Sequence, residues 1–557
     1  MLKGERRMKN YRQYKHEAQA SVSAGLTCSR CVLVCLYPPL AKPGDTTNGE
    51  WDCPATGDGP VGLRGGGENE RAAGSFGQLA LFVRMCVVLL ALVAGAASAF
   101  ASDRPNILLV LSDDHSMPHL GCYGDANCQR LNLTPNLDRF AGEGMRLGRA
   151  YTAASQCAPS RTSIFAGRSP VDLGVTRFAQ PARADVQLFT DVLRKQGYWV
   201  GLDGRHQHLD GKLSEPSHVE ETLRARGMRN LEERFDHFTR HHPTKGRQLG
   251  EIGERFTEVL DKVPEGKPWF LYFGFSQTHR PFGDDHEGID PAKLTLPPDW
   301  PDLPEVRADY AKFLADLRDL DSGFGLLMKA LEDRGAAKDT LVVFMGDNGE
   351  ALLRGKGTLF TRGTHVPLLI RWPGKIKAGT TSDILVSGTD LAPTFLAAAG
   401  ADAPEKMTGH DFLPELLGQP FAGRSCVFAE RGWHWGPITR ADGFDLSRSV
   451  TTERYHYIYN ALPDRGYEPV DMSNNPAWTA IKAAQEAGTL SPLHGRLYFR
   501  KPRPIVELYD LKNDPYQTRN LAKDSEHKEI ECKLRIELEK WMVRESDYLP
   551  LPSHVLR

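Results

Sequence analysis

The feature that most constrains the fold is the regular alternation of short apolar runs with amphipathic stretches from Arg104 onward. The runs NILLVLSDD, YWVGLDG, PWFLYFGFS and TLVVFMGDNG have the length and branched content of buried strands. TPNLDRFAGEG, VQLFTDVLRKQG and ADYAKFLADLRDLDSGFGLLMKALEDRG are predicted to be helices, the first with Thr134 as N-cap and Pro135 at its first position. We therefore predict an α/β fold with a large, mostly parallel sheet sandwiched by helices.

The pattern changes near residue 400. There TTERYHYIYN and VELYDLKNDPYQTRNLA predict short antiparallel strands, and SEHKEIECKLRIELEKWMVRE predicts a closing helix. A chain of 557 residues is also too long for one compact core. We therefore expect a large domain over residues 102–400 and a smaller α+β domain with a short antiparallel sheet over residues 401–557.

The first 101 residues differ from the rest, since they hold the Gly-rich GPVGLRGGGENE and little amphipathic periodicity. We expect residues 1–84 to be a mis-called start or an unstructured extension. The run MCVVLLALVAGAASAFA follows Arg84 and contains the small-residue pattern Ala97-Ser98-Ala99, so residues 85–101 are predicted to be a signal peptide. Its apolar core is too short to cross a bilayer comfortably. We expect an exported protein, periplasmic or secreted, with no stable membrane span.

The number of cysteines and the net charge limit which disulfides and which binding partners are expected. A chain beginning near Ala101 keeps five cysteines, and an odd number in an exported protein indicates one thiol with another task. Cys122 and Cys128 are close enough to pair with each other, although a pairing with Cys426 or Cys532 is equally allowed. The formal net charge of −2 provides no basic surface for a phosphate backbone, so nucleic acid is not expected as a partner.

Polar residues follow four of the predicted strands, at the point where each strand ends. Open parallel sheets bind ligands at the carboxyl ends of their strands, so these residues should converge at one edge. Any one of them could be only a cap or a turn former, but four strand ends that all carry such residues favour a site. They are Asp113 and Asp114, then Arg205 and His208, then His279, and finally Asp347 and Asn348.

Asp113, Asp114, Asp347 and Asn348 offer only oxygen ligands, which suit calcium or magnesium better than zinc. The cation would hold and polarise an anionic substrate group. Donors around it would stabilise a tetrahedral oxyanion, and the candidates are Arg205, His208, His279 and Lys356. The alternatives are a bare turn at Asp347-Asn348-Gly349 and solvated basic residues, and His206 competes with His208 for the same place.

Cys157-Ala158-Pro159-Ser160-Arg161 matches the C-x-P-S-R signature of the type I sulfatases, and TSIFAGR continues it. GYWVGLDGRHQHLDG, SQTHRPF, GDNGEALLRGKGTLFTRGTHVPLLIRWPG and ELYDLKNDPYQTRNLA also resemble sulfatase segments in the expected order. The resemblance covers most of the region from Arg104 to about Ala522 and implies an alkaline-phosphatase-like fold, with the catalytic domain over residues 102–400. The alternative is an unmodified, buried cysteine that opens a helix.

The resemblance implies that a formylglycine-generating enzyme oxidises Cys157 to formylglycine, whose hydrate attacks sulfur and forms a covalent sulfate ester. It implies calcium, with magnesium as a possible substitute, bound by Asp113, Asp114, Asp347, Asn348 and an oxygen of converted Cys157. Arg161 would anchor the hydrate, and Ser160 would help to orient the turn. His208 and Arg205 would steer the nucleophile and leaving group, while His279 and Lys356 would contact the sulfate.

The sequence departs from the family pattern in two places. Arg205 stands where the family usually has lysine, and arginine presents a rigid fork instead of a point charge. TLFTRGTHVP lacks an acidic Glu-Gly-Gly, so the chain looks more like heparan N-sulfatase and related carbohydrate sulfatases. We expect a sulfated glycan as substrate. The candidate sugar contacts, which could also be solvated loop residues, are Arg177, Arg183, Trp433, His434 and Trp435.

Two other functions fit the same residues. One is a phosphonate or phosphodiester hydrolase with the same fold and the same modified cysteine, because phosphate and sulfate esters share a tetrahedral shape. The other is a catalytically silent glycan-binding protein that is stabilised by calcium. The second is opposed by the complete set of competent residues at the catalytic positions.

Overall fold

The structure is a computed structural model, and it describes most of the chain from Arg104 to Leu556. The expectations for residues 1–84 and 85–101 therefore lie outside the described residues. Within 104–556 the residues left out are 179, 206–207, 210, 212–215, 229, 240–245, 284–285, 287, 435–439 and 441–442.

An eight-stranded sheet forms the centre, in the order β4-β3-β5-β1-β6-β7-β2-β8. Only β7 runs antiparallel to its neighbours β6 and β2, so the predicted, mostly parallel α/β sheet is confirmed. The four strands recognised in the sequence are adjacent, as β3-β5-β1-β6, which brings their carboxyl ends to one edge. The strands are β1 Asn106–Ser112, β2 Met145–Tyr151, β3 Trp199–Gly204, β4 His237–Phe238, β5 Trp269–Gly274, β6 Thr340–Gly346, β7 Leu368–Arg371 and β8 Thr380–Ser387.

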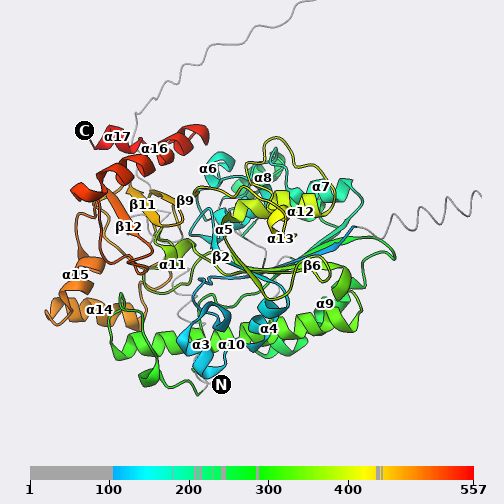
Figure 1. Cartoon of the computed structure of the whole chain (residues 1–557), viewed down its shortest axis with the longest axis horizontal. Coiled ribbons are helices and arrows are strands. Elements are labelled where there is room, and N and C mark those ends of the chain that lie inside the picture. The colour runs from blue at the N-terminus through cyan, green and yellow to red at the C-terminus, as the bar shows by residue number, and fades with distance from the viewer. Residues whose placement is uncertain are drawn as a thin grey trace, which may run out of the picture. The chain divides into compact units, whose positions relative to one another are not determined.

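Helices cover both faces of this sheet, because the side chains of each strand alternate between two apolar layers. Leu108 and Val110 of β1 join the layer under α10, whereas Ile107 and Leu109 join the layer under α5. Figure 1 shows α3, α4, α9 and α10 on one face and α5, α7, α12 and α13 on the other. The helices are α3 Ala126–Leu131, α4 Pro135–Glu143, α9 Ile252–Leu260 and α10 Pro304–Asp333 on the first face, then α5 Cys157–Ala166, α7 Phe189–Lys195, α12 Leu391–Ala398 and α13 Leu413–Leu416 on the second.

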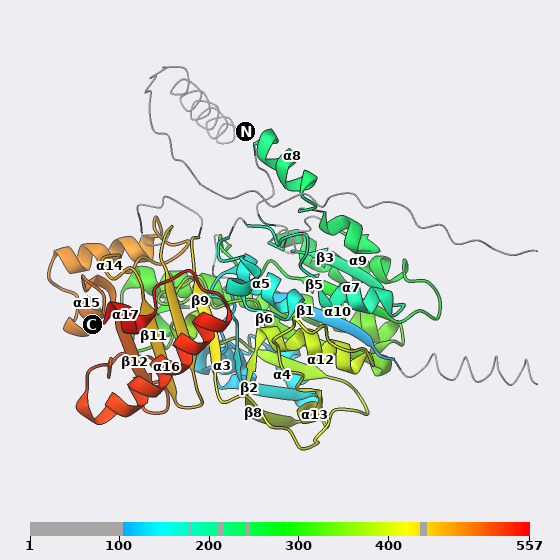
Figure 2. The ribbon, with the colours of Figure 1, turned by 90° about the horizontal axis from the view of Figure 1, so that it is seen from above.

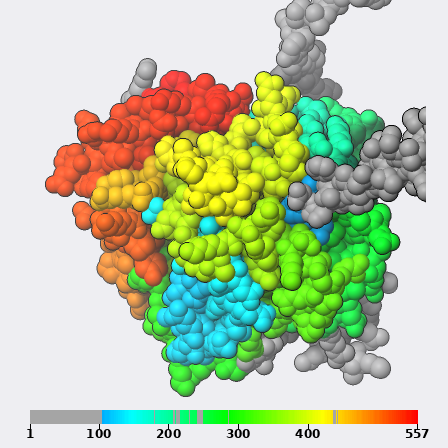
Figure 3. Space-filling view, turned by 45° about the vertical axis from the view of Figure 1, so that its right-hand side comes forward, coloured from blue at the N-terminus to red at the C-terminus, as the bar shows by residue number. Residues whose placement is uncertain are grey.

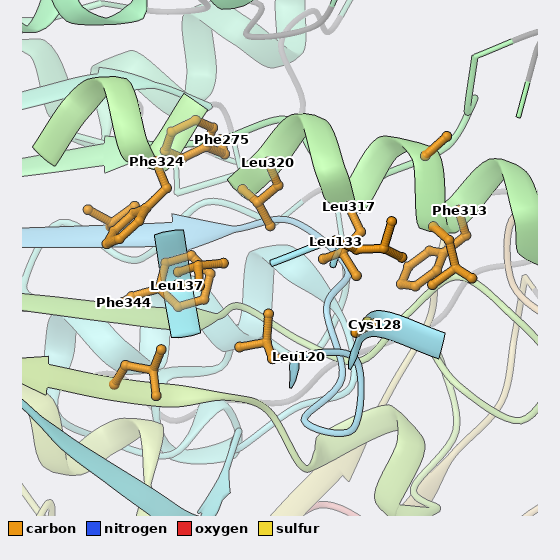
Figure 4. Close-up of a cluster of buried hydrophobic side chains, with 14 of the residues drawn as sticks. Leu120, Cys128, Leu133, Leu137, Phe275, Phe313, Leu317, Leu320, Phe324 and Phe344 are labelled. Carbon is orange, nitrogen blue, oxygen red and sulfur yellow. The ribbon is translucent and has the colours of Figure 1, made fainter. Parts of the chain in front are cut away.

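The long helix α10 supplies much of the first apolar layer. Phe313, Leu317, Leu320 and Phe324 line one side of this helix and face the sheet and α4 (Figure 4). The ring of Phe324 lies edge to face with that of Phe344 on β6, at 5.4 Å between centroids. Burial of such side chains contributes about 1.5–3 kcal/mol each, so this layer fixes the sheet whose edge carries the site.

A second, four-stranded antiparallel sheet lies in the order β12-β11-β10-β9, as predicted. Helix α16 packs on it, with Trp541 stacked on Phe428 at 5.2 Å between ring centroids. Figure 3 shows this C-terminal part, in orange and red, against the yellow segment near residue 400. The division at 400/401 stays a prediction. The elements are β9 Val427–Arg431, β10 Ser447–Thr451, β11 Tyr455–Asn460, β12 Val506–Asp510, α14 Pro476–Glu486, α15 Pro492–Phe499, α16 Lys528–Arg544 and α17 Pro552–Val555.

Short helices complete the described part of the chain. No helix among the described residues is long and apolar enough to cross a membrane. Cys122, Cys128, Cys426 and Cys532 are free thiols in the structure, so none of the disulfides considered above is formed. The remaining short elements are α6 Pro170–Leu173, α8 Ser217–Ala225 and α11 Thr361–Thr364, with 3₁₀ turns η1 Gly121–Tyr123, η2 Leu231–Arg234, η3 Gly246–Glu251, η4 Pro291–Lys293, η5 Ala337–Asp339, η6 Gly388–Asp390 and η7 Ser525–His527.

Candidate active site

Cys157 is the first residue of α5, and its side chain is fully buried at the carboxyl edge of the large sheet. Its Sγ lies 3.6 Å from Asp113 Oδ1 and 3.7 Å from Asp114 Oδ1, at the end of β1. Burial, together with the nearby carboxylates, raises the pKa of the Cys157 thiol well above its usual value. An unmodified thiol at this position is therefore a poor nucleophile, since the thiolate is the reactive form.

Three carboxylates and one amide converge beside Cys157, and all four are fully buried. The backbone N–H of Asp114 donates to Asp347 Oδ1 at 2.9 Å, and Asn348 Nδ2 donates to Asp114 Oδ1 at 2.9 Å. Asp114 has a φ of 62°, a left-handed conformation. The loops after β1 and β6 therefore place Asp113, Asp114, Asp347 and Asn348 in one cluster.

The charges of this cluster fit a divalent cation. Burial and the neighbouring carboxylates raise the pKa of Asp114 to about 7, and burial raises that of Asp347 to about 6. Among the described residues no donor reaches the buried Asn348 Oδ1. Ligand atoms of Asp113, Asp347, Cys157 and His208 lie within 4.8 Å of one another. Buried carboxylates that repel each other and an oxygen without a donor are what a hard cation would satisfy.

Two arginines hold the carboxylate of Asp113 in its ionised form. Arg161 is fully buried, with Nη2 3.3 Å from Asp113 Oδ1 and Nε 2.8 Å from Asp347 Oδ2. Arg205 Nε contacts Asp113 Oδ2. Although burial opposes ionisation, these guanidinium groups keep the pKa of Asp113 well below its usual value. Gly204 positions Arg205, because its φ of 81° and the carbonyl of Gly274, 2.2 Å from an added Cβ, exclude a side chain.

Lys356 and His279 lie on the outer side of the cluster, beside Asp114, whereas His208 lies beside Asp113, Cys157 and Asp347. Lys356 Nζ is 3.0 Å from Asp114 Oδ2, and its side chain is 1% exposed. His279 Nε2 lies 3.7 Å from the same oxygen. Burial and nearby positive charges lower the pKa of His279 and of His208 well below their usual values, so both rings are neutral. His208 is buried in the cluster, whereas the competing His206 lies outside the described residues.

The structure also places at the site some residues that the sequence did not single out. Asp471 pairs with Lys356 Nζ at 2.9 Å, and Gln156 donates to His434 Nδ1 at 3.1 Å. Tyr272 contacts Arg161, and the ring of Phe178 lies 5.1 Å from that of His208. Gln156 could have been found from the sequence, since it directly precedes the C-x-P-S-R motif at Cys157. Asp471 had none, because it lies in an irregular loop 115 residues after Lys356.

The proposed sugar contacts divide into three groups. His434 is buried in the site, where the ring of Phe178 lies 5.0 Å away. Trp433 directly precedes His434, and its backbone carbonyl accepts a hydrogen bond from Gln156 at 3.2 Å. Arg177 and Arg183 are exposed and bonded to neighbours in their own loop, and Trp435 lies outside the described residues. β9, which leads to this loop, runs beside the segment before α5 (Figures 1 and 2).

Comparison with known proteins assigns the chain that carries this site to a family. The family model described as Sulfatase matches residues 105–401, more than half of the 557-residue chain. This chain belongs to the sulfatase family. It is therefore a sulfate ester hydrolase, and the resemblance and the alkaline-phosphatase-like fold expected from C-x-P-S-R are confirmed. A second model, for the C-terminal region of N-sulphoglucosamine sulphohydrolase, matches residues 349–498, in agreement with the branch inferred from the sequence.

Individual relatives agree with this assignment. Human N-sulphoglucosamine sulphohydrolase is 28% identical over 521 residues, which span 85% of this chain and 96% of the relative. An ulvan-active sulfatase of Formosa agariphila is 27% identical over 480 residues, covering 82% of this chain and 77% of the relative. The solved phosphonate monoester hydrolase of Agrobacterium radiobacter has the same fold, with a TM-score of 0.59 at 20% identity over 79% of this chain and 96% of that chain.

Proposed function

We propose that this sulfatase releases sulfate from a sulfated carbohydrate, using formylglycine made from Cys157 and a bound calcium ion, with magnesium as a possible substitute. The observation that carries the proposal is the position of Cys157 Sγ, 3.6 Å and 3.7 Å from two carboxylates of the cation-fitting cluster. A hydrated aldehyde at this position would supply the nucleophilic hydroxyl and hold sulfate as a covalent ester, because a thiol with a raised pKa cannot attack well.

In this proposal Asp113, Asp114, Asp347 and Asn348 hold the cation, with an oxygen of converted Cys157 as a further ligand. When bound, the cation would supply Lewis-acid polarisation to a sulfate group held beside these residues. Arg161, which contacts Asp113 and Asp347, fixes these carboxylates and anchors the hydrate. The chain thus pre-organises positive charge around the point where negative charge builds up during displacement.

The outer residues bind the sulfate and assist the leaving group. Lys356 supplies one buried positive charge beside Asp114. The backbone carbonyl of Arg280 accepts from His279 Nδ1, so the neutral His279 presents Nε2 to the site as an acceptor, and once protonated it becomes a donor to the leaving atom. Arg205 and His208 flank the nucleophile on the other side. The fork of Arg205 is directed at Asp113, so it acts on that carboxylate and not as a mobile proton carrier.

A sulfated carbohydrate is proposed as substrate because the named relatives act on such compounds by their titles, as N-sulphoglucosamine sulphohydrolase and ulvan-active sulfatase. Export to the periplasm or the exterior is also proposed, from the apolar run at residues 85–101. Maturation then needs a formylglycine-generating enzyme as a transient partner. The domain boundary at 400/401 completes this proposal and can be checked by limited proteolysis.

The experiment compares three substrates on the matured protein: 4-nitrophenyl sulfate, an aryl phosphonate monoester and an aryl phosphodiester. We expect the sulfate to give the largest kcat/KM and chelation of the cation to remove the activity. A diester or phosphonate that ranks far above the sulfate would favour the alternative of a phosphonate or phosphodiester hydrolase, and the chain shares its fold with a solved phosphonate monoester hydrolase. Binding of a sulfated glycan without hydrolysis of any ester would identify a catalytically silent protein.

A further inference from the structure

A cavity of about 480 Å³ lies on the face of the small sheet that is turned away from α16. Ile458 and Tyr509 line this cavity, whereas their neighbours Tyr457 and Leu508 join the apolar cluster that includes α16. This alternation is expected, because successive side chains of a strand point to opposite faces of a sheet. Helix α15 forms another wall. None of the residues assigned above to the catalytic site lines this cavity.

The cavity nevertheless borders the active site, because two chain segments contribute to both. Gly357, directly after Lys356, lines the cavity, and so does Glu468, three residues before Asp471. Lys356 and Asp471 are themselves paired at 2.9 Å. The missing side chain at Gly357 lets these segments approach, since an added Cβ would lie 2.2 Å from Val470 Cγ2. A ligand in the cavity would therefore lie against the loop that carries Lys356.

Positive charge dominates the lining of the cavity, which contains six arginines and three carboxylates. Like charges gathered around one space repel each other, and an anion in that space relieves the repulsion. The excess of arginine therefore indicates a negatively charged ligand. The arginines are Arg354, Arg431, Arg496, Arg500, Arg503 and Arg519.

The lining carboxylates neutralise only part of this charge. Asp445 accepts from both Nη atoms of Arg503, at 2.9 Å and 2.7 Å. Glu507 instead accepts from two neutral groups, the side-chain amide of Asn460 at 2.7 Å and the hydroxyl of Tyr509. It forms no ion pair within the described part of the chain. Hydrogen bonds inside the lining thus leave several guanidinium groups available to a ligand.

Two buried donors of the lining have no acceptor. The Nη atoms of Arg354 donate to the backbone carbonyls of Tyr516 and Gln517, both at 2.8 Å. Its Nε and the Nε of Arg503 are buried, and no acceptor among the described residues reaches either atom. A buried N–H without an acceptor is unfavourable, and a charged donor is especially so. Oxygen atoms of a bound anion would satisfy these groups.

Helix α15 adds two guanidinium groups from one face. Arg496 and Arg500 both line the cavity and are four residues apart, so they are neighbours on the helix surface. Both are exposed, and neither forms an ion pair with a carboxylate of the described residues. Guanidinium groups present forks of N–H donors that match the oxygens of a sulfate or a carboxylate. The α15 pair thus gives an entering anion two cationic contacts.

We propose that this cavity is a second sulfate-binding site, distinct from the catalytic pocket. Its ligand is either the free sulfate ion or a sulfate group carried on a glycan. Sulfate is the oxyanion that hydrolysis of a sulfate ester releases, and the volume of the cavity suits a small group. The inference goes beyond the proposed hydrolysis at Cys157, because it gives the cavity no part in the chemical step.

The test removes the two arginines of α15 in the variant Arg496→Gln/Arg500→Gln, at exposed positions where the fold should be kept. The matched control is Arg139→Gln/Arg544→Gln, which removes the same charge from side chains that are 60% exposed and lie outside the cavity. Sodium sulfate is titrated into each protein by calorimetry, with the ionic strength held constant by sodium chloride. We expect one sulfate ion to bind the wild type and the control about tenfold more tightly than the α15 variant.

A second titration, with low-mass dextran sulfate, identifies the source of the sulfate group. Weaker binding of dextran sulfate by the α15 variant alone, with equal binding of the free ion, would assign the cavity to sulfate carried on a glycan. Weaker binding of the free ion would assign it to inorganic sulfate. Equal binding of both ligands by the α15 variant and the control would overturn the proposal. Neither titration needs turnover, so a failure to hydrolyse any ester would refute the proposed function and leave this inference intact.

Discussion

The sheet-edge cluster and the outer wall of the site are built in different ways. The sheet-edge cluster comprises Asp113, Asp114, Cys157, Asp347 and Asn348, which are fully buried and come from strand ends and the start of α5. The outer wall comprises Lys356, His434 and Asp471, which lie on irregular loops, and Asp471 is partly exposed. The difference indicates that strand ends hold the part of the site that must be rigid, while loops, which vary more readily, carry its outer residues.

The largest expected effect breaks the cluster at its nucleophile. Cys157→Ala should reduce kcat by about 10⁴-fold or more, because nothing else in the cluster supplies the attacking atom. Folding should change by only about 1 kcal/mol, since one buried sulfur is lost. Steady-state kinetics and thermal unfolding check this expectation. Cys532→Ala, at a partly exposed thiol on α16, is the control and should keep normal rates. Normal rates in Cys157→Ala would refute the assigned nucleophile.

The next effect tests the cation-fitting carboxylates. Asp347→Ala removes one ligand and leaves Arg161 with a single carboxylate partner, so activity and calcium affinity should both fall about 100-fold. Calorimetric titration of calcium into the chelator-treated protein measures the affinity. Asp339→Ala, at an exposed carboxylate before β6, should change neither quantity. An unchanged calcium affinity in Asp347→Ala would reject the metal assignment.

The smallest expected effect tests how tightly the outer wall is packed against the rest of the site. Gly357 follows Lys356 with a φ of 73°, and an added Cβ would lie 2.2 Å from Val470 Cγ2. Gly357→Ala should therefore lower the free energy of unfolding by about 2 kcal/mol and raise KM, because Lys356 and Asp471 are pushed apart. Gly374→Ala has a φ of 76° but open space around it, so it measures the backbone cost alone. Equal losses in the two variants would show that the contact with Val470 does not matter.

The sequence predicts the cluster better than the wall, for a physical reason. Apolar periodicity locates strands, and parallel strands bring their carboxyl ends together, so the amino-acid pattern alone places Asp113, Asp114 and Asp347 at one edge. The antiparallel β7 and the short β4 carry too little periodicity to be recognised. Asp471 depends on a left-handed backbone and on pairing across the fold with Lys356, which local patterns do not encode. Whether thiols pair likewise depends on distances in the fold, which sequence spacing does not give even for the nearby Cys122 and Cys128.

The most direct test of the account is the mass of the tryptic peptide Ala150–Arg161 from protein purified from its native host. The account predicts a peptide whose mass corresponds to formylglycine at Cys157. A peptide that carries only an intact thiol at Cys157 would contradict it.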